Sequence, residues 1–239
     1  MPVSRMFHAA VLSTIFLAQA AIADNASLNE GSPIAHAAWR GHDIPVYRIG
    51  ELEAANTPQG MDGFAIRVAR VLHAWTRDHA AEATGNLCRT ADGTRWGAVL
   101  LTIHAHAVSP LTDACPAGME NTGTTITSRL QRQHFRASAT DRLFLPPALA
   151  HADAIATRPD SFSADVYARP GYLVGRFWLH FQDGKGLGRR VWNMRKNQPA
   201  TGSQRHADIA ACLGRLNAAD AGCAAGIPGV PRADLHALT

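Results

Sequence analysis

One amphipathic helix constrains the fold of this chain more than any other feature. Between Gly63 and about His79 the apolar side chains recur at i, i+4, i+7, i+8 and i+11, at Phe64, Val68, Val71, Leu72 and Trp75. This spacing gathers them on one face of an α-helix, and such a face is buried against another layer of structure. Asp62 precedes the segment and is predicted to cap its first turn.

The segments on both sides of this helix are predicted to form strands. Ile44–Ile49 precedes it, and Asn86–Thr90 and Arg95–Val108 follow it as a hairpin around an Asp-Gly turn, because glycine accepts the positive φ that such a turn needs. Alternation in the second hairpin strand assigns one face to the core and the other to His104 and His106. Further strands are expected over 124–130, 171–181 and 189–194, and a short helix over 207–216.

The first 23 residues are predicted to be a secretory leader. Arg5 supplies the positive charge, Ala9 to Ala21 is too short to span a bilayer, and Ala21-Ile22-Ala23 fits the small-x-small cleavage rule. A retained membrane anchor is the alternative, and the polar Asp24-Asn25 pair weighs against it. We therefore expect a periplasmic or secreted mature chain without a transmembrane segment. It comprises a lead-in over 24–43, one domain over 44–196, and a C-terminal helix and tail over 197–239.

Four cysteines in an exported chain favour disulfides. The first choice among three connectivities pairs neighbours in sequence, Cys88 with Cys115 and Cys212 with Cys223. Zinc binding by the four cysteines is the rival interpretation, but the chain has no Cys-x-x-Cys pair.

The charge balance of the mature chain indicates no nucleic-acid partner. Without Arg5, 22 basic residues face 19 acidic ones, a net charge of only +3. The most basic run, from Lys185 to Arg195, could touch an anionic surface such as a phosphate or a cell-wall polymer. Alternatively, it is a solvated strand edge, where positive charge discourages aggregation.

The order of strand, long helix, glutamate, hairpin, strand, loop and hairpin resembles the JAB/MPN family of zinc metallopeptidases over roughly Ile44 to Met194. The resemblance implies an α/β fold in which a mixed, curved sheet packs on the long helix, here stapled by disulfides. It also implies a zinc ion held by a His-x-His pair and an aspartate, with a glutamate as general base. Such a site keeps one position of the zinc for water, and a nearby carboxylate takes the proton of that water.

Carried over residue by residue, this resemblance assigns the base to Glu82 and the last ligand to Asp165, with Ser163 in the Phe-Ser-Ala-Asp run before it. The spacing from Ser163 to Asp165 is one residue shorter than in the family. Thr127 and Arg129 occupy the two histidine positions. Threonine is a poor zinc ligand, and arginine has no lone pair to offer. Considered without the resemblance, Glu82 is an ordinary surface carboxylate.

The His104-Ala105-His106 sequence is a second candidate metal site. On one strand face the two imidazoles would lie about 7 Å apart at the backbone, which suits chelation of one metal. Asp113 is a candidate third ligand, and His134 is a candidate for a vacated site. Two polar residues alternating on an exposed strand would give the same pattern, and a single loop histidine is usually just solvated.

Two functions are therefore expected, the first being favoured. In the first, the metal site has decayed, no cofactor is bound, and the domain binds a protein or peptidoglycan-type partner. In the second, the chain is an active zinc peptidase or isopeptidase, with Glu82 as base and ligands recruited from His104, His106, Asp113, His134 or Asp165. The loss of two of three direct ligands favours the first function, because surrounding adjustments cannot replace them.

Overall fold

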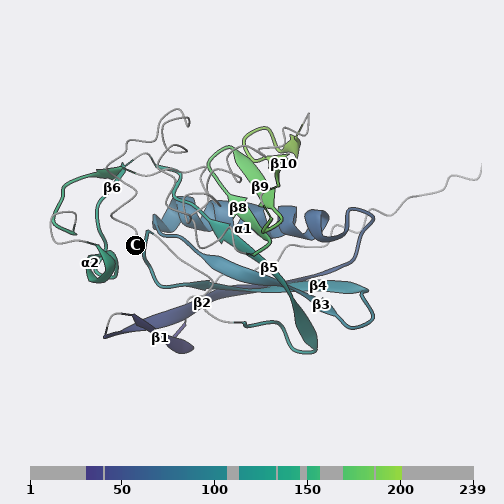
Figure 1. Cartoon of the computed structure of the whole chain (residues 1–239), viewed down its shortest axis with the longest axis horizontal. Helices are drawn as coiled ribbons and strands as arrows, with labels where there is room; N and C mark the ends of the chain where they lie inside the picture. The colour runs from purple at the N-terminus through teal and green to yellow at the C-terminus, as the bar shows by residue number, and fades with distance from the viewer. Residues whose placement is uncertain are drawn as a thin grey trace, which may run out of the picture.

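A nine-stranded sheet packed on one long helix makes up most of the described structure (Figure 1). The computed structural model describes residues 31–39, 41–106, 113–132, 134–145, 150–156, 169–185 and 187–200. The mixed, sheet-dominated α/β architecture with one long helix confirms the predicted fold class in this general form. The predicted leader, Ser163, Asp165, Cys212, Cys223 and the 207–216 helix lie outside the described residues.

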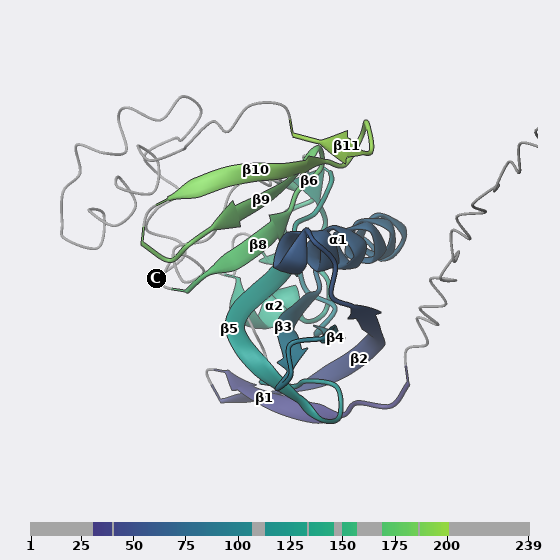
Figure 2. The same cartoon turned by 90° about the vertical axis from the view of Figure 1, so that its right-hand side faces the viewer.

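The strands of the large sheet run antiparallel except at one joint. β5 pairs in parallel with β8, so the chain must cross over between them, whereas every other printed pairing is antiparallel. Figure 2 shows the sheet curving around the long helix α1 (Gly60–His79). In spatial order the strands are β1 (Ala35–Trp39), β2 (His42–Ala55), β4 (Arg95–Thr102), β3 (Thr84–Thr90), β5 (Met119–Ser128), β8 (Gly171–Val174), β9 (Trp178–Gln182), β10 (Gly188–Asn193) and β11 (Gln198–Pro199).

Three short elements lie beside this sheet. A second sheet pairs β6 (His134–Phe135) with β7 (Ile155–Ala156), and α2 (Asp141–Phe144) adds one helical turn. Among the described residues, no helix is long and apolar enough to cross a membrane.

Helix α1 buries the predicted face but begins differently from the prediction. Phe64, Val68, Leu72 and Trp75 are at most 3% exposed and form the main core with the strands beneath them. The helix starts at Gly60, and no side chain caps it. The prediction of Asp62 as the cap is therefore wrong, because this carboxylate instead bonds across to the second half of the sheet.

Asp62 joins the first turn of α1 to β8 and β10. Its carboxylate accepts a hydrogen bond from the Tyr172 hydroxyl and lies 2.7 Å from Arg189 Nη2 at both oxygens. Burial, followed by the bond to Asp62, raises the pKa of Tyr172. The hydroxyl therefore stays protonated as a donor. These contacts hold helix and hairpin together across more than 100 residues of sequence.

A smaller core lies on the face of the sheet opposite α1, in the part formed by β1, β2 and β4. It consists of Ile44, Val46, Val99, Leu101, Ile103 and Ala105. Residues 35–39, expected in a loose lead-in, form β1 and place Ala35 and Ala37 against this core. Both faces of β4 are thus buried, and its sequence is a nearly continuous apolar run for that reason.

The hairpin predicted at Asp92-Gly93 is confirmed, but several strand limits differ. Gly93 has φ +71° and donates its N–H to Thr90 at 2.8 Å. Asp92 accepts hydrogen bonds from Thr90 and Thr94, and these bonds are the main reason that its pKa is lowered to about 2. β5 begins at Met119 inside the expected loop, and the segment expected as one strand over 171–181 is itself the β8–β9 hairpin.

The predicted Cys88–Cys115 disulfide is present, with an S–S distance of 2.01 Å. It ties β3 to the segment that leads into β5. Pro116 and Met119 of this segment lie over Gly97 of β4, where an added Cβ would stand 2.7 Å from Pro116 Cγ and 2.4 Å from Met119 Sδ. Glycine at 97 therefore allows the disulfide-closed segment to lie on the sheet.

Candidate functional site

A buried row of polar side chains crosses β3 and β5 on the face opposite α1. Ile126 and Ser128 point to α1, since Ile126 is in the main core and Thr76 of α1 donates to Ser128 Oγ at 2.6 Å. Alternation along the strand turns the intervening residues to the other face. We call these residues the polar row: Glu82, Thr84, Asn86, Thr125, Thr127 and Arg129.

Cross-strand register builds this row. Thr84 pairs with Thr127 and Asn86 with Thr125, and all four are at most 4% exposed. The hydroxyls of Thr84 and Thr127 lie 3.0 Å apart, and Thr84 Oγ1 also donates to the carbonyl of Ile126 at 3.2 Å. Thr127 is thus fully buried and engaged in a hydrogen bond.

Glu82 and Arg129 form a buried ion pair at one end of the row. Arg129 Nη1 lies 2.9 Å from Glu82 Oε2, and the side chains are 12% and 3% exposed. The backbone N–H of Leu130 donates to the other carboxylate oxygen at 3.3 Å. The interpretation of Glu82 as an ordinary surface carboxylate is therefore wrong.

The backbone around Glu82 is equally well fixed. Its N–H donates to the carbonyl of Ala105 at 2.9 Å, and its carbonyl accepts from Thr102 Oγ1 at 2.8 Å. On the opposite face, Ser128 Oγ accepts from the N–H of Ala83 at 2.9 Å. The segments 102–105 and 128–130 thus fix the backbone on both sides of Glu82, and each oxygen of its carboxylate accepts a hydrogen bond.

The two histidines of the His-x-His sequence do not share a strand face. β4 ends at Thr102, and His104 has φ +54°, a left-handed conformation that turns the chain. The ring of His104 packs against Tyr47 at a centroid distance of 5.0 Å. His106 instead faces Asp141. The predicted strand geometry for joint chelation is therefore wrong, because β4 ends before His104 and the two imidazoles contact different residues.

His106 and Asp141 form a second buried polar pair. Their side chains are 8% and 5% exposed, and His106 Nδ1 is hydrogen bonded to Asp141 Oδ2. The backbone N–H of His106 donates to Asp141 Oδ1 at 2.7 Å, and Phe135 stacks on the imidazole at 3.9 Å. Burial by itself would raise the pKa of Asp141, but the hydrogen bonds from His106 and Ser138 outweigh it and lower the pKa.

Sequence reasoning missed Asp141, although a signal was present. Ser138 and Asp141 are three apart, and each bonds the backbone N–H of the other, at 2.7 and 3.0 Å. This reciprocal bonding resembles a capping box, which a Ser-x-x-Asp sequence indicates, but it precedes α2, whose N-cap Thr140 makes no side-chain cap bond. The pair fixes the turn that presents Asp141 to His106.

Replacing Asp141 by asparagine should lower the free energy of unfolding by about 2 kcal/mol at pH 7. The NH2 group of asparagine would face N–H donors that now bond to the carboxylate, so at least one of these hydrogen bonds would be lost. The lowered pKa makes this stabilisation fully present above about pH 4 and lost as the pH falls further. Urea unfolding at pH 7 and pH 3 measures both. The control is Asp153→Asn at an almost fully exposed side chain. If the free energies of unfolding of wild type and D141N differ by as much at pH 3 as at pH 7, the stabilising role of the ionised Asp141 is contradicted.

A polar hollow of about 490 Å³ lies at the other end of the polar row. Its lining includes Asn86 and Thr125 of the row, together with Asp113, Asn121, Gly123 and Arg169. Asn121 Nδ2 donates to Asp113 at 3.1 Å. The lining thus combines one carboxylate, one guanidinium, two amides and a hydroxyl. This set suits a ligand that carries both donors and acceptors.

The candidate metal ligands are therefore dispersed. Asp113 lines the hollow, His106 is bonded to Asp141, and His134 is exposed on β6. Within the described ranges, no three His, Cys, Asp or Glu side chains are grouped so as to hold a metal. No protein family, curated protein or solved structure matches this chain.

Proposed function

We propose that this protein is a non-catalytic binding module related to the JAB/MPN fold, in which the Glu82–Arg129 ion pair stands in place of a zinc centre. The observation that carries the proposal is this ion pair. The residue at an expected histidine position donates to the residue expected to act as the base, at 2.9 Å.

The position of the pair supports the resemblance on which the proposal rests. Glu82 and Arg129 are 47 residues apart in sequence and were matched to the family separately. They nevertheless lie side by side at adjacent strand ends. A guanidinium also places positive charge next to the carboxylate, as a zinc ion would, so it compensates the buried charge electrostatically.

The chemistry of the pair argues against a role for it in zinc-dependent hydrolysis. A guanidinium has no lone pair, coordinates no water and does not release a proton at neutral pH. Both carboxylate oxygens of Glu82 already accept a hydrogen bond, one from Arg129 and one from the backbone of Leu130. A general base must lie within hydrogen-bond distance of the proton it removes. We therefore propose that this face of the sheet binds a ligand and that the polar hollow receives it.

The polar hollow suits a peptide-like partner. Asp113 and Arg169 offer opposite charges, and Asn86 and Asn121 offer amides that pair with peptide groups. A protein segment or a peptidoglycan stem peptide presents these groups together. We assign the ligand to this class.

Zinc titration of the chelator-treated mature chain tests the loss of the metal centre. Calorimetry should detect no stoichiometric site, and EDTA should leave the melting temperature unchanged, because no ligand set replaces the two histidines. Stoichiometric zinc whose removal lowers the melting temperature would overturn the proposal.

The same preparation should bind purified peptidoglycan sacculi through the polar hollow. Arg169→Glu should weaken this binding, because it reverses the one positive charge in the lining. Arg142→Glu, an equal charge change at an exposed position on α2, is the control. Equal binding by both variants would remove the hollow from the proposal. Zinc-free protein that binds no sacculi would point to a protein partner.

A further inference from the structure

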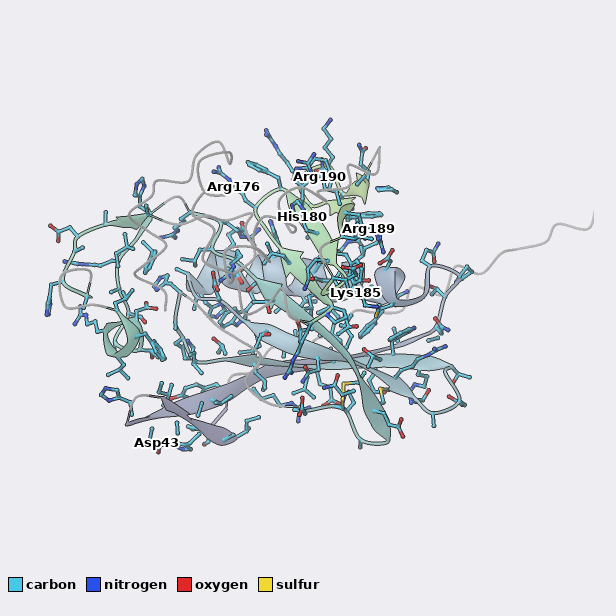
Figure 3. The ribbon with its side chains drawn as sticks, in the orientation of Figure 1. Asp43, Arg176, His180, Lys185, Arg189 and Arg190 are labelled. Carbon is cyan, nitrogen blue, oxygen red and sulfur yellow. A yellow bond between two sulfur atoms is a disulfide. The ribbon has the colours of Figure 1, made fainter. Side chains whose placement is uncertain are left out.

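Positive charge is concentrated on the C-terminal hairpins. Residues 169–200 contain seven Lys and Arg and a single acidic residue, a net charge of +6. The whole chain carries +4, so all its other residues together sum to −2. Figure 3 shows Arg176, Arg189, Arg190 and Lys185 grouped around β9 and β10, far from Asp43 near β1. We call Arg176, Lys185, Arg195 and Lys196, which are exposed and do not line the polar hollow as Arg169 does, the basic surface.

One arginine of these hairpins, Arg189, is paired with the carboxylate of Asp62, but the four members of the basic surface are not paired with one in the described structure. Elsewhere, several exposed arginines pair with an acid, as Arg48 does with Glu51 and Arg95 with Glu53. No ion pair among the described residues includes a member of the basic surface. The single acid within residues 169–200, Asp183, accepts hydrogen bonds from the backbone N–H groups of Lys185 and Leu187 at 2.7 and 3.0 Å. Its carboxylate therefore holds the β9–β10 turn.

Aromatic rings support the guanidinium groups in this region. Arg176 lies 5.0 Å from the ring centroid of Phe177, and Arg190 lies 4.7 Å from that of Trp178. On the adjoining helix, Arg70 lies 5.4 Å from Trp192. Cation–π contact restricts where each guanidinium points. Within the basic surface, the guanidinium of Arg176 is therefore held in place before a ligand arrives, which lowers the entropic cost of binding.

We propose that the basic surface binds an anionic polysaccharide, a linear glycan that carries carboxylate groups. The four charges lie in the turns between β8 and β11, which suits an extended polymer, and guanidinium forks match planar carboxylates. Each of these rings holds a guanidinium over one face, which leaves less ring surface on which nucleic-acid bases could stack. Leu187 is the only large apolar side chain exposed in the described part of this region, too little to insert into a lipid surface.

This inference does not rest on the proposed function, because the basic surface lies outside the Glu82–Arg129 pair and the polar hollow. It would stand even if zinc were found. It also predicts a partner chemistry different from that of the hollow, so the two bind separate ligands.

The test measures binding of the full chain to polygalacturonate at several salt concentrations. Arg176→Glu/Arg195→Glu should weaken binding ~10-fold or more, since like charges then oppose the glycan. Arg136→Glu/Arg142→Glu, with the same charge change at exposed positions elsewhere, should bind as wild type does. Equal loss in both double variants, or in neither, would overturn the proposal.

A second variant separates guanidinium recognition from charge alone. Arg176→Lys/Arg195→Lys keeps the charge but loses the forks, and should weaken glycan binding several-fold. A single-stranded oligonucleotide of equal charge and phosphatidylglycerol vesicles serve as competing polyanions. Tighter binding of either than of polygalacturonate, or a Lys variant that binds like wild type, would overturn the assignment to a carboxylated glycan.

Discussion

Replacing Arg129 by methionine should lower the free energy of unfolding by about 3–5 kcal/mol, because it leaves the Glu82 carboxylate buried without its cation. Glu82 is 2% exposed, so water cannot replace the guanidinium. For a domain of this size the melting temperature should fall by roughly 6–20 °C. Glu82→Gln should also destabilise, contrary to the expectation for a simple site carboxylate that its replacement leaves stability untouched.

A double-mutant cycle separates the pair from its surroundings. Glu82→Met/Arg129→Met removes both charges and should recover much of the stability lost in either single variant, since a buried ion pair often exchanges with apolar side chains at little cost. Arg95→Met removes the partner of Glu53 in an exposed pair and should cost about 0–1 kcal/mol. Additive losses in the cycle would mean that the two side chains are not coupled.

Removing the Cys88–Cys115 disulfide should lower the free energy of unfolding by about 3.5 kcal/mol. The bond closes a loop with a sequence separation of 27, and the chain-entropy relation gives this value for a loop of that length. Cys88→Ala/Cys115→Ala should accordingly melt roughly 7–14 °C below the parent.

Reductant provides the control for this prediction. Treating the parent with reductant should reproduce most of the fall, and treating the double variant isolates any effect of Cys212 and Cys223. Non-reduced peptide mapping should recover a peptide that links 88 to 115. A fragment joining Cys88 to a C-terminal cysteine, or a double variant as stable as the parent, would be inconsistent with the structure.

Sequence patterns correctly predicted the elements that depend on contacts between residues close in sequence. The spacing of Phe64, Val68 and Leu72 identified α1, and Asp92-Gly93 identified the hairpin, because both depend on residues close in sequence. The same reasoning failed for β1 at 35–39. This short, alanine-rich strand is held mainly by its antiparallel pairing with β2, which no periodicity reveals.

The candidate site was predictable only in outline. A resemblance brought Glu82 and Arg129 to attention, but it could not show that one side chain neutralises the other. That contact requires β3 and β5 to be neighbours, with β4 on the other side of β3, and this order is a property of the whole sheet. The left-handed turn at His104 has no glycine to announce it, so the pattern was extended as a strand past its actual end.

The single parallel joint between β5 and β8 has a consequence for the order of folding. Hairpins such as β3–β4 and β9–β10 close short loops, whereas β5 and β8 are separated by 42 residues of chain. Contacts between residues distant in sequence form slowly, because the entropy of closing the loop is lost before the contacts compensate for it. We therefore expect the strands before β5 to assemble with α1 as one unit, and the β8–β10 unit to dock afterwards. The contacts of Asp62 with Tyr172 and Arg189 then form last and join the two units in the native state.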